Sequence, residues 1–246
     1  MNWIVTGSSR GIGAATARMA AARANSVIVN YSVDREGAEA VVTGIREAGG
    51  RAIAVQADIA READVVRLFE TADREFGAPS VLVNNAAITG GFRRVEDIDE
   101  ELLARVFAVN VTGSFLCARE AVRRMSTRHG GQGGAIVNLT SRAAALGSPN
   151  EWVHYAATKG AIDTLTVGLA REVATEGIRV NAIAAGLIET GMHAAAGAPD
   201  RVERMAPGIP MQRSASPDEG AEAVLWLASP AASYVTAAIL PVSGGR

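Results

Sequence analysis

Short apolar, β-branched runs alternate with longer amphipathic stretches along the whole chain of 246 residues. The apolar runs lie near residues 2–6, 27–30, 52–56, 80–84, 134–139, 178–184 and 238–242. The amphipathic stretches lie near residues 12–24, 35–48, 61–76, 99–128, 152–175 and 217–228. Strands that alternate with helices of this length pair in parallel through right-handed crossovers. The sequence therefore predicts a single α/β domain, residues 1–246, with a doubly wound parallel sheet of about seven strands and helices on both faces.

A glycine-rich loop follows the first apolar run. The segment Gly7-Ser-Ser-Arg-Gly11-Ile-Gly13 joins this run to an alanine-rich helical stretch that reaches about Ala24. In such a unit the glycines let the backbone approach a pyrophosphate, and the helix N-terminus attracts its negative charge. The spacing is GxxxGxG rather than the commoner GxGxxG, and three glycines so close together could also form only a tight turn. The position directly after a first strand favours a Rossmann-type dinucleotide-binding fold.

The chain has a single lysine. Among its 24 basic residues only Lys159 is not an arginine, and it follows Tyr155 by four positions. On a helix such positions share a face, about 6 Å apart along the axis. A cation at that distance lowers the tyrosine pKa from about 10, which favours general acid/base chemistry near neutral pH. Taken alone, the pair could equally be a stray lysine beside a core tyrosine.

Five separated motifs occur in the order seen in short-chain dehydrogenases/reductases. They are Thr6-Gly-x-x-x-Gly-x-Gly13, Asn84-Asn-Ala-Ala87, Asn110, Ser141 and Tyr155-x-x-x-Lys159. The chain resembles this family from residue 2 to its C-terminus, and is similar to 3-oxoacyl-[acyl-carrier-protein] reductase-like and glucose dehydrogenase-like members. The resemblance implies an NAD(P)-dependent oxidoreductase that interconverts a carbonyl (ketone, aldehyde or 3-oxoacyl thioester) and an alcohol.

The resemblance also implies a catalytic role for four residues. Tyr155 would donate a proton to the developing alkoxide, and Ser141 would hydrogen-bond the same oxygen. Lys159 would lower the pKa of Tyr155 and hold the nicotinamide ribose. Asn110 would anchor a water in the proton relay, although this residue could instead be a helix N-cap or mark a kink.

The choice of Ser141 depends on its position at the end of an apolar run. Thr140 and Ser148 are competing hydroxyls, but a strand end at this edge of the sheet favours Ser141. Ser141 precedes Tyr155 by 14 residues, one more than in most relatives. We expect the extra residue within 148–154, a loop beside the pocket.

The cofactor preference depends on the end of the second strand. That strand ends Val29-Asn30-Tyr31-Ser32, with no acid until Asp34. NAD-preferring enzymes often have an acid there that binds the ribose 2′-hydroxyl. Arg10, inside the glycine loop, can reach a 2′-phosphate bidentately, and resembling family members with arginine at this position mostly prefer NADP(H). The sequence therefore favours NADP(H) over NAD(H).

Further cofactor contacts are implied by the resemblance. Asp58 and Ile59 would contact adenine, although Asp58 could instead cap a helix. Asn85 would lie near the adenosine ribose, unless it only satisfies local backbone groups. The full set of implied cofactor residues is Gly7, Ser9, Arg10, Gly11, Ile12, Gly13, Asn30, Tyr31, Ser32, Asp58, Ile59, Asn85, Ala86, Tyr155, Lys159, Gly186, Ile188 and Thr190.

Residues 189–214 break the alternation and are rich in Gly, Ala, Pro and Met. A long irregular insert in a compact domain is usually functional, and ligands in such sheets bind beyond the carboxyl ends of the strands. We therefore expect residues 189–214 to form a substrate lid. Trp152, His154, Met192 and His193 are expected to shape the pocket beneath it.

Composition argues against several other classes of protein. A net charge of −2 provides no basic field for nucleic acid or an anionic membrane. No apolar run approaches the ~20 residues that span a membrane, and the three histidines lack metal-ligand spacing. The single cysteine, Cys117, excludes an intramolecular disulfide framework and fits a reducing compartment. We expect a cytoplasmic enzyme with a small-molecule substrate and no metal.

Two questions about function stay open from the sequence. A catalytically idle nucleotide-binding regulator or scaffold is the alternative, because one fold hosts many functions. Arg123, Arg124 and Arg128 could attract an acidic carrier protein or form a solvated helix face. The resemblance also implies a homotetramer, paired through the helices near 110–128 and 152–175 and through the C-terminal strand.

Overall fold

One parallel sheet organises the computed structural model, which describes residues 1–246. Its order is β3-β2-β1-β4-β5-β6-β7. The strands are β1 (Asn2–Val5), β2 (Ser26–Tyr31), β3 (Arg51–Gln56), β4 (Val81–Asn84), β5 (Gly134–Ser141), β6 (Ile178–Ala185) and β7 (Ile239–Val242). The order reverses between β1 and β4, which places a ligand crevice at their carboxyl ends. The predicted single-domain, doubly wound fold is confirmed.

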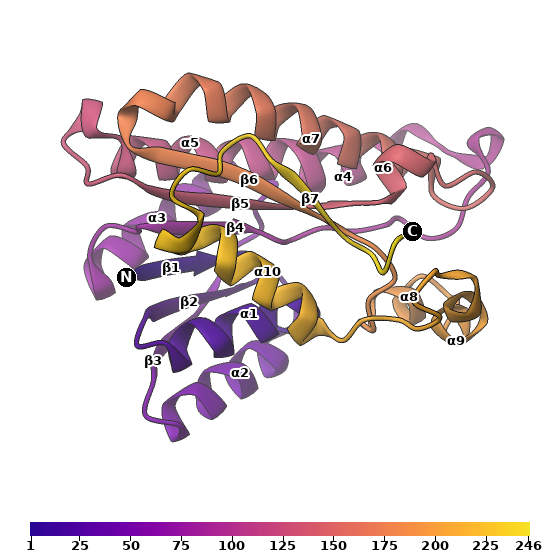
Figure 1. Ribbon diagram of the computed structural model, residues 1–246, viewed down its shortest axis with the longest axis horizontal. Helices are drawn as coiled ribbons and strands as arrows, with labels where there is room; N and C mark the ends of the chain where they lie inside the picture. The colour runs from indigo at the N-terminus through magenta and orange to yellow at the C-terminus, as the bar shows by residue number, and fades with distance from the viewer.

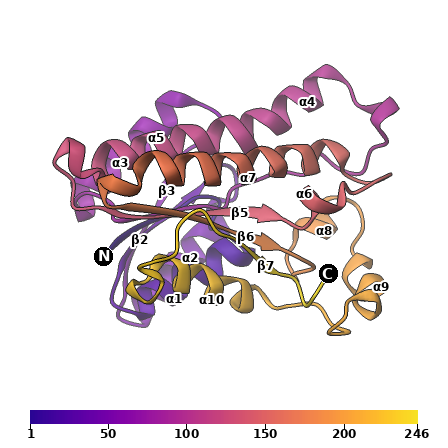
Figure 2. The same ribbon diagram turned by 45° about the horizontal axis from the view of Figure 1, so that its top comes forward.

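Helices cover both faces of this sheet, as Figures 1 and 2 show. One face carries α1 (Gly11–Ala22), α2 (Arg35–Glu47) and α10 (Pro217–Ala228). The other carries α3 (Glu62–Phe76), α4 (Glu100–Phe107), α5 (Gly113–Met125) and α7 (Val153–Val173). This arrangement of three layers follows from the alternation of strands and helices along the chain.

The strands are apolar throughout because both of their faces are buried. In β1, Trp3 and Val5 join the core beneath α1, α2 and α10. Ile4, between them, joins the core beneath α3, α5 and α7. Successive side chains of a strand point to opposite faces, so a strand covered on both sides needs an unbroken apolar run. This is the pattern that made the strands recognisable in the sequence.

The stretch predicted as one helix near 99–128 consists of α4, a π-helical turn (Ala108–Thr112) and α5. Glu100–Met125 is long and apolar enough to cross a membrane by length and composition, with a mean hydropathy of 1.3 in its most apolar window. The segment is not one apolar run, because charged residues such as Arg105 and Arg119 interrupt it, so the expectation about apolar runs is not contradicted. In the structure the segment is packed, since Cys117 and Met125 belong to the core beneath the sheet.

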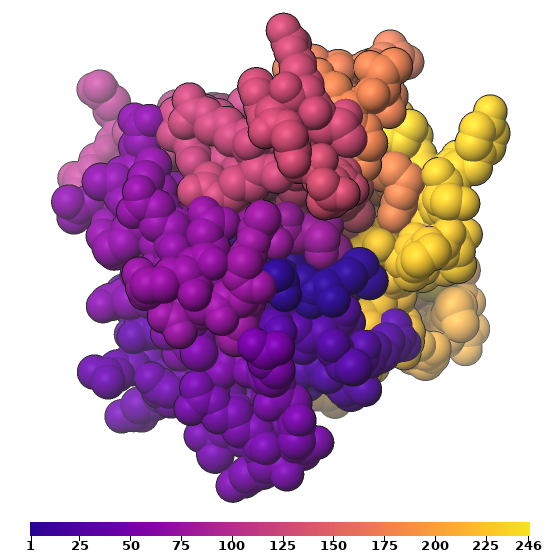
Figure 3. All heavy atoms as spheres, turned by 90° about the vertical axis from the view of Figure 1, so that its left-hand side faces the viewer, coloured from indigo at the N-terminus to yellow at the C-terminus, as the bar shows by residue number.

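Residues 189–214 lie beyond the carboxyl ends of the strands, at the right of Figure 1. They include two short helices, α8 (Met192–Ala195) and α9 (Arg201–Met205), so the insert is less irregular than predicted. A backbone bridge between Ile188 and Ala215 closes its base. The opposite end of the molecule, seen in Figure 3, carries the start of the chain in indigo.

Candidate active site

A cavity of 730 Å³ lies at the carboxyl ends of the strands. Every predicted cofactor residue except Gly13 lines it, and so does Ser141. Gly13 lies behind the wall, where a Cβ would approach the Asn85 side-chain nitrogen to 2.5 Å. Gly13 is thus required for packing of the glycine loop and does not face the cavity. Asn110 also does not line the cavity.

The glycine loop has the conformation and charge that a pyrophosphate needs. Gly7 and Gly11 have φ angles of +59° and +58°, which L-residues with a Cβ rarely adopt. At the start of α1, Arg10 provides no side-chain cap, and the first turn contains no acidic residue. Its free N–H groups and the positive end of the helix dipole therefore form an anion site on the cavity wall. The chain fits a dinucleotide here.

Two asparagines brace this loop from beneath. The Asn30 side-chain oxygen accepts from the Gly7 N–H at 3.1 Å. The Asn85 side-chain nitrogen donates to the carbonyl oxygens of Thr6 and Gly7, both at 2.8 Å. The Asn85 amide group thus satisfies local backbone groups, which is the alternative considered from the sequence. Both residues still line the cavity.

The residues that end β2 are not acidic, and the first carboxylate after them, Asp34, lines the cavity. Asp34, the first acid after this strand, caps α2 by accepting from the Gly37 N–H at 3.0 Å. Arg10 is exposed and lines the same part of the cavity. Arg10 thus places a guanidinium, a group that can bind a phosphate bidentately, on this cavity.

Asp58 stabilises the turn before α3 and forms an ion pair at the cavity. Its Oδ1 accepts from the Ala60 N–H at 3.0 Å, which stabilises the turn before α3. Its Oδ2 accepts from both terminal nitrogens of Arg105 at 3.1 Å. Asp58 and Arg105 both line the cavity, so this ion pair forms part of its wall.

Ser141, Tyr155 and Lys159 meet where the end of β5 faces the first two turns of α7. Tyr155 is buried, and Ser141 is its hydrogen-bonding neighbour. The Ser141 hydroxyl donates to the Ala185 carbonyl oxygen at 3.4 Å. The Ser141 hydroxyl also accepts from the Ala143 N–H at 3.1 Å. The competing hydroxyl of Thr140 donates to the Lys159 carbonyl oxygen at 3.1 Å and is thereby committed to α7. The strand-end serine is the hydroxyl that faces Tyr155.

Burial reverses the pKa shift that was expected for Tyr155. Burial raises the pKa of Tyr155 to about 12, and only the Ser141 hydrogen bond opposes that rise. Lys159 lies over the tyrosine ring, 5.5 Å from its centroid, and donates to the Leu139 carbonyl oxygen at 2.7 Å. Burial in turn lowers the pKa of Lys159 to about 8, against the field of Asp163. The ammonium thus faces the backbone, and desolvation outweighs its effect on the phenol.

Asn110 lies in the π-helical turn and binds structural groups. Its side-chain oxygen accepts from the Ile88 N–H at 2.9 Å, and its nitrogen donates to the Ile88 carbonyl oxygen at 2.9 Å. The same nitrogen donates to the Thr158 hydroxyl at 3.0 Å, and that hydroxyl donates to the Tyr155 carbonyl oxygen at 2.7 Å. Asn110 therefore connects the strand end after β4 with the first turn of α7. It marks a kink, one of the two alternatives to a relay role.

An aromatic wall borders the tyrosine. Trp152 stacks on Phe92 at 4.8 Å and on His193 at 5.9 Å between ring centroids, and meets Tyr155 edge to face at 5.9 Å. Trp152, Met192 and His193 line the cavity as predicted. His154 does not, because its ring nitrogen is held by the Thr89 carbonyl oxygen at 2.7 Å. Phe92 was not predicted from the sequence.

Comparison with known proteins agrees with this arrangement. The family model described as enoyl-(acyl carrier protein) reductase matches residues 7–246. The Escherichia coli (strain K12) protein named uncharacterized oxidoreductase YgfF is 50% identical over 99% of this chain and 98% of its own. The 3-oxoacyl-[acyl-carrier-protein] reductase of Synechocystis sp. is 39% identical over 98% of this chain and 95% of its own.

The chain belongs to the short-chain dehydrogenase/reductase family. A solved short chain dehydrogenase from Burkholderia cenocepacia J2315, in complex with NADP, is 31% identical. It superposes with a TM-score of 0.89 over 99% of this chain and 96% of its own. As a member of the family, this protein is an NAD(P)-dependent oxidoreductase that acts on CH–OH groups or the matching carbonyls.

Besides Arg105, three arginines that line the cavity of this short-chain dehydrogenase/reductase were not predicted from the sequence. They are Arg142, Arg201 and Arg246. Arg142 directly follows Ser141, so its position after a strand end was a usable signal. Arg201 and Arg246 had no such signal, because the tertiary fold alone brings them to the same cavity.

The arginines on α5 are engaged in ion pairs. Arg123 and Arg124 both pair with the buried carboxylate of Glu120, at 2.8 and 2.7 Å. Arg124 also reaches Asp73 at 2.7 Å. With their charges balanced, these residues offer little free positive field to an acidic carrier protein.

Proposed function

We propose that this protein is an NADP(H)-dependent reductase that interconverts a ketone or aldehyde and an alcohol, with Tyr155 as general acid/base. The observation that carries the proposal is the meeting of Ser141, Tyr155 and Lys159 in the same cavity as an uncapped, glycine-rich helix N-terminus. A hydride donor bound by that loop and a proton donor then share one space. A 3-oxoacyl thioester remains within the same reaction class.

When bound, the nicotinamide supplies the hydride that reduces the carbonyl carbon. The Tyr155 hydroxyl donates its proton to the substrate oxygen as charge develops there. Ser141 donates a hydrogen bond to the same oxygen and holds it in line with Tyr155. Lys159 would hold the ribose of the cofactor and compensate the phenolate that remains. Asn110 supports the turn of α7 that carries the tyrosine, and a water held near it would return the proton.

Cofactor preference is part of the proposal. The exposed guanidinium of Arg10 and the engagement of Asp34 in capping α2 support NADP(H) over NAD(H). The residues that would bind the cofactor are the cavity-lining set already named, with Gly13 acting through packing. Residues 189–214 would form the substrate lid. The protein would act in the cytoplasm on a small molecule and as a homotetramer.

The rival function is a catalytically idle nucleotide-binding regulator on the same fold. An idle protein needs the glycine loop but has no use for a buried lysine or for a serine hydrogen-bonded to a buried tyrosine. Keeping Lys159 buried costs solvation free energy, as its lowered pKa indicates. Such a cost is typical of residues retained for chemistry.

The test is oxidation of NADPH with a panel of ketones and aldehydes, for the wild type and for Tyr155→Phe. We expect turnover by the wild type and a loss of about 10²–10⁴-fold in the variant, which lacks only the acidic hydroxyl. Cofactor affinity, measured by fluorescence titration, is the control and should change little. NADPH binding without turnover of any carbonyl in the panel would favour the idle regulator.

A further inference from the structure

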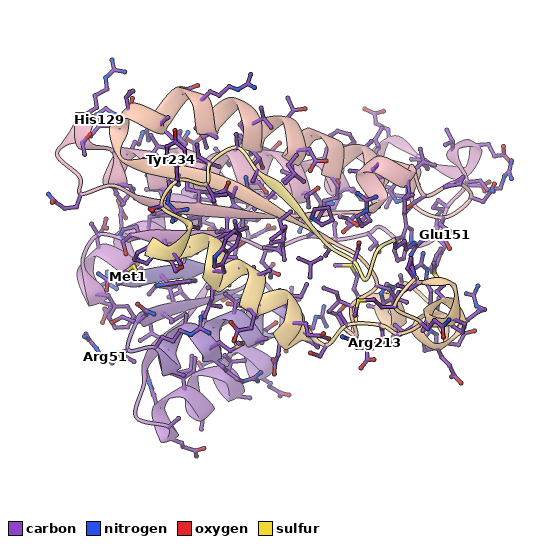
Figure 4. All side chains as sticks on the ribbon, in the orientation of Figure 1. Met1, Arg51, His129, Glu151, Arg213 and Tyr234 are labelled. Carbon is purple, nitrogen blue, oxygen red and sulfur yellow. The ribbon has the colours of Figure 1, made fainter.

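Three guanidinium groups converge at the substrate side of the cavity. Arg142 follows the strand end that carries Ser141, Arg201 lies on α9, and Arg246 ends the described chain. The three come from segments far apart in the sequence. Figures 1 and 4 show α9, the C-terminus and Glu151 at the same end of the molecule.

The positive charge of this cluster exceeds its negative charge. Glu151 is the acid that pairs with it, through the Arg201 Nη2 at 2.5 Å. The Arg142 Nε donates to the main-chain oxygen of Arg246 at 2.7 Å. The guanidinium of Arg246 makes no hydrogen bond or ion pair with the protein. Three guanidinium groups thus lie beside one side-chain carboxylate, Glu151, and the main-chain oxygen of Arg246; Arg201 is buried, and Arg142 and Arg246 are partly buried.

Mutual repulsion marks these groups as a cluster. Burial lowers the pKa of Arg246, Arg201 and Arg142 act in the same direction, and only Glu151 opposes them. Burial also lowers the pKa of His193, and the charge of Arg201 lowers it further. His193 is therefore neutral at pH 7 and adds no charge of its own. An anion in the cavity would relieve this repulsion.

Arg201 is held rigidly beside the reacting tyrosine. Its side chain is 5% exposed, and its guanidinium stacks over the Trp152 ring at 4.7 Å. Its Nε is buried without a hydrogen-bond partner. Trp152 in turn contacts the Tyr155 ring. The cluster is thus separated from the proton donor by one aromatic side chain.

We propose that the substrate carries a carboxylate, bound by Arg246 with Arg201 and Arg142, so that the enzyme interconverts an oxo acid and the matching hydroxy acid. The inference rests on the proposed reductase function and names its substrate class. A guanidinium is a planar fork that binds a carboxylate through two parallel hydrogen bonds. Bound in this way, the carboxylate orients the substrate and delivers its carbonyl to Tyr155 and Ser141.

The test compares each of three oxo acids with its own methyl ester: 3-oxobutanoate, 4-oxopentanoate and 5-oxohexanoate. Within each pair the carbonyl is the same and only the charge differs. We expect one acid to exceed its ester in kcat/KM by about 10- to 100-fold, the effect of a charge-assisted hydrogen-bonded pair. Arg246→Gln should reduce that acid-to-ester ratio by about tenfold or more, mainly through KM.

Arg204→Gln is the matched control. Arg204 is on α9 beside Arg201, but it pairs with Asp200 at 3.5 Å and does not line the cavity. This variant loses the same charge and should keep the wild-type acid-to-ester ratio. A ratio that falls equally in both variants would reflect only the overall charge of the protein and would overturn the proposal.

Binding separates a failure of this inference from a failure of the proposed function. Calorimetry with NADP⁺-saturated protein measures affinity for acid and ester without turnover. Esters that are reduced as well as their acids would overturn the carboxylate site and leave the reductase function standing. Acids that bind more tightly than esters only when Arg246 is present would support the site even without turnover. Equal affinity of acid and ester would overturn it.

Discussion

The ammonium of Lys159 lies in a site that disfavours its charge. It is buried, and its hydrogen bond goes to the Leu139 carbonyl oxygen. We predict that Lys159→Arg, which keeps the charge but not the compact three-donor shape, lowers kcat/KM by about 10²–10⁴-fold. Circular dichroism and thermal unfolding should show an intact fold. Near-wild-type turnover would mean that the lysine contributes only positive field.

The pH dependence gives the same prediction a second readout. Because burial lowers the pKa of Lys159 to about 8, the wild type loses the ammonium as pH rises through that value. Its kcat/KM for ketone reduction should fall along with this charge. The arginine of Lys159→Arg stays protonated in this range. The kcat/KM of this slower variant should therefore not fall as pH rises through 8. If kcat/KM depends on pH in the same way for the wild type and Lys159→Arg between pH 6 and 10, the ammonium of Lys159 is not the group that titrates.

Arg10 is the residue on which cofactor choice depends. We predict that Arg10→Ala lowers the ratio of kcat/KM with NADPH to kcat/KM with NADH by about 10- to 100-fold, since a charge-assisted pair with the 2′-phosphate is lost. Arg35→Ala is the control, because Arg35 is exposed at the start of α2 and does not line the cavity. An unchanged ratio in Arg10→Ala would show that Arg10 does not contact the 2′-phosphate.

The π-helical turn between α4 and α5 carries Asn110, whose side chain bonds the Ile88 backbone and Thr158. We predict that Asn110→Ala lowers the free energy of unfolding by about 1–3 kcal/mol, because the Ile88 N–H and carbonyl groups lose their buried partners. Ser114→Ala, which removes one hydroxyl bonded to the Asn110 carbonyl oxygen, should cost less. Urea unfolding measures both. Unchanged stability in Asn110→Ala would contradict the structural role and favour the role of Asn110 in the proton relay.

The segment 189–214 contacts its surroundings mainly through side chains. Arg201 pairs with Glu151, Arg213 pairs with Glu219 at 2.6 Å, and His193 stacks on Trp152. We predict that amide hydrogen exchange in 189–214 slows when NADP(H) and a substrate analogue bind together, as for a lid that closes over substrate. α2, on the far face of the sheet, is the internal control. Equal exchange with and without ligands would count against a lid.

Exposed apolar side chains on the long helices point to self-association. Phe115 on α5 is 50% exposed and Leu103 on α4 is 41% exposed. We predict a homotetramer at micromolar concentration, measured by light scattering, and dissociation to a smaller species in Phe115→Glu. Val95→Glu alters another exposed apolar residue away from these helices and should stay tetrameric. A monomeric wild type would refute the assembly.

Much of the fold and the outline of the site follow from the spacing of residue types along short segments of the sequence. Strand faces alternate every residue, so strands covered on both sides read as continuous apolar runs. Helix turns repeat about every 3.6 residues, so the Tyr155–Lys159 spacing predicts one shared face. The glycine loop and Ser141 were predictable because each follows a strand, and strand ends meet at one edge of the sheet.

What the sequence alone determined is therefore the order of elements, the sheet, and the identity of many cavity residues. Only the tertiary structure decided the pKa direction of Tyr155, the structural contacts of Asn110 and the charge cluster of Arg142, Arg201 and Arg246. The physical reason is that periodicity belongs to neighbouring residues of one segment. Desolvation and charge repulsion depend instead on distances between segments that only the packed fold brings together.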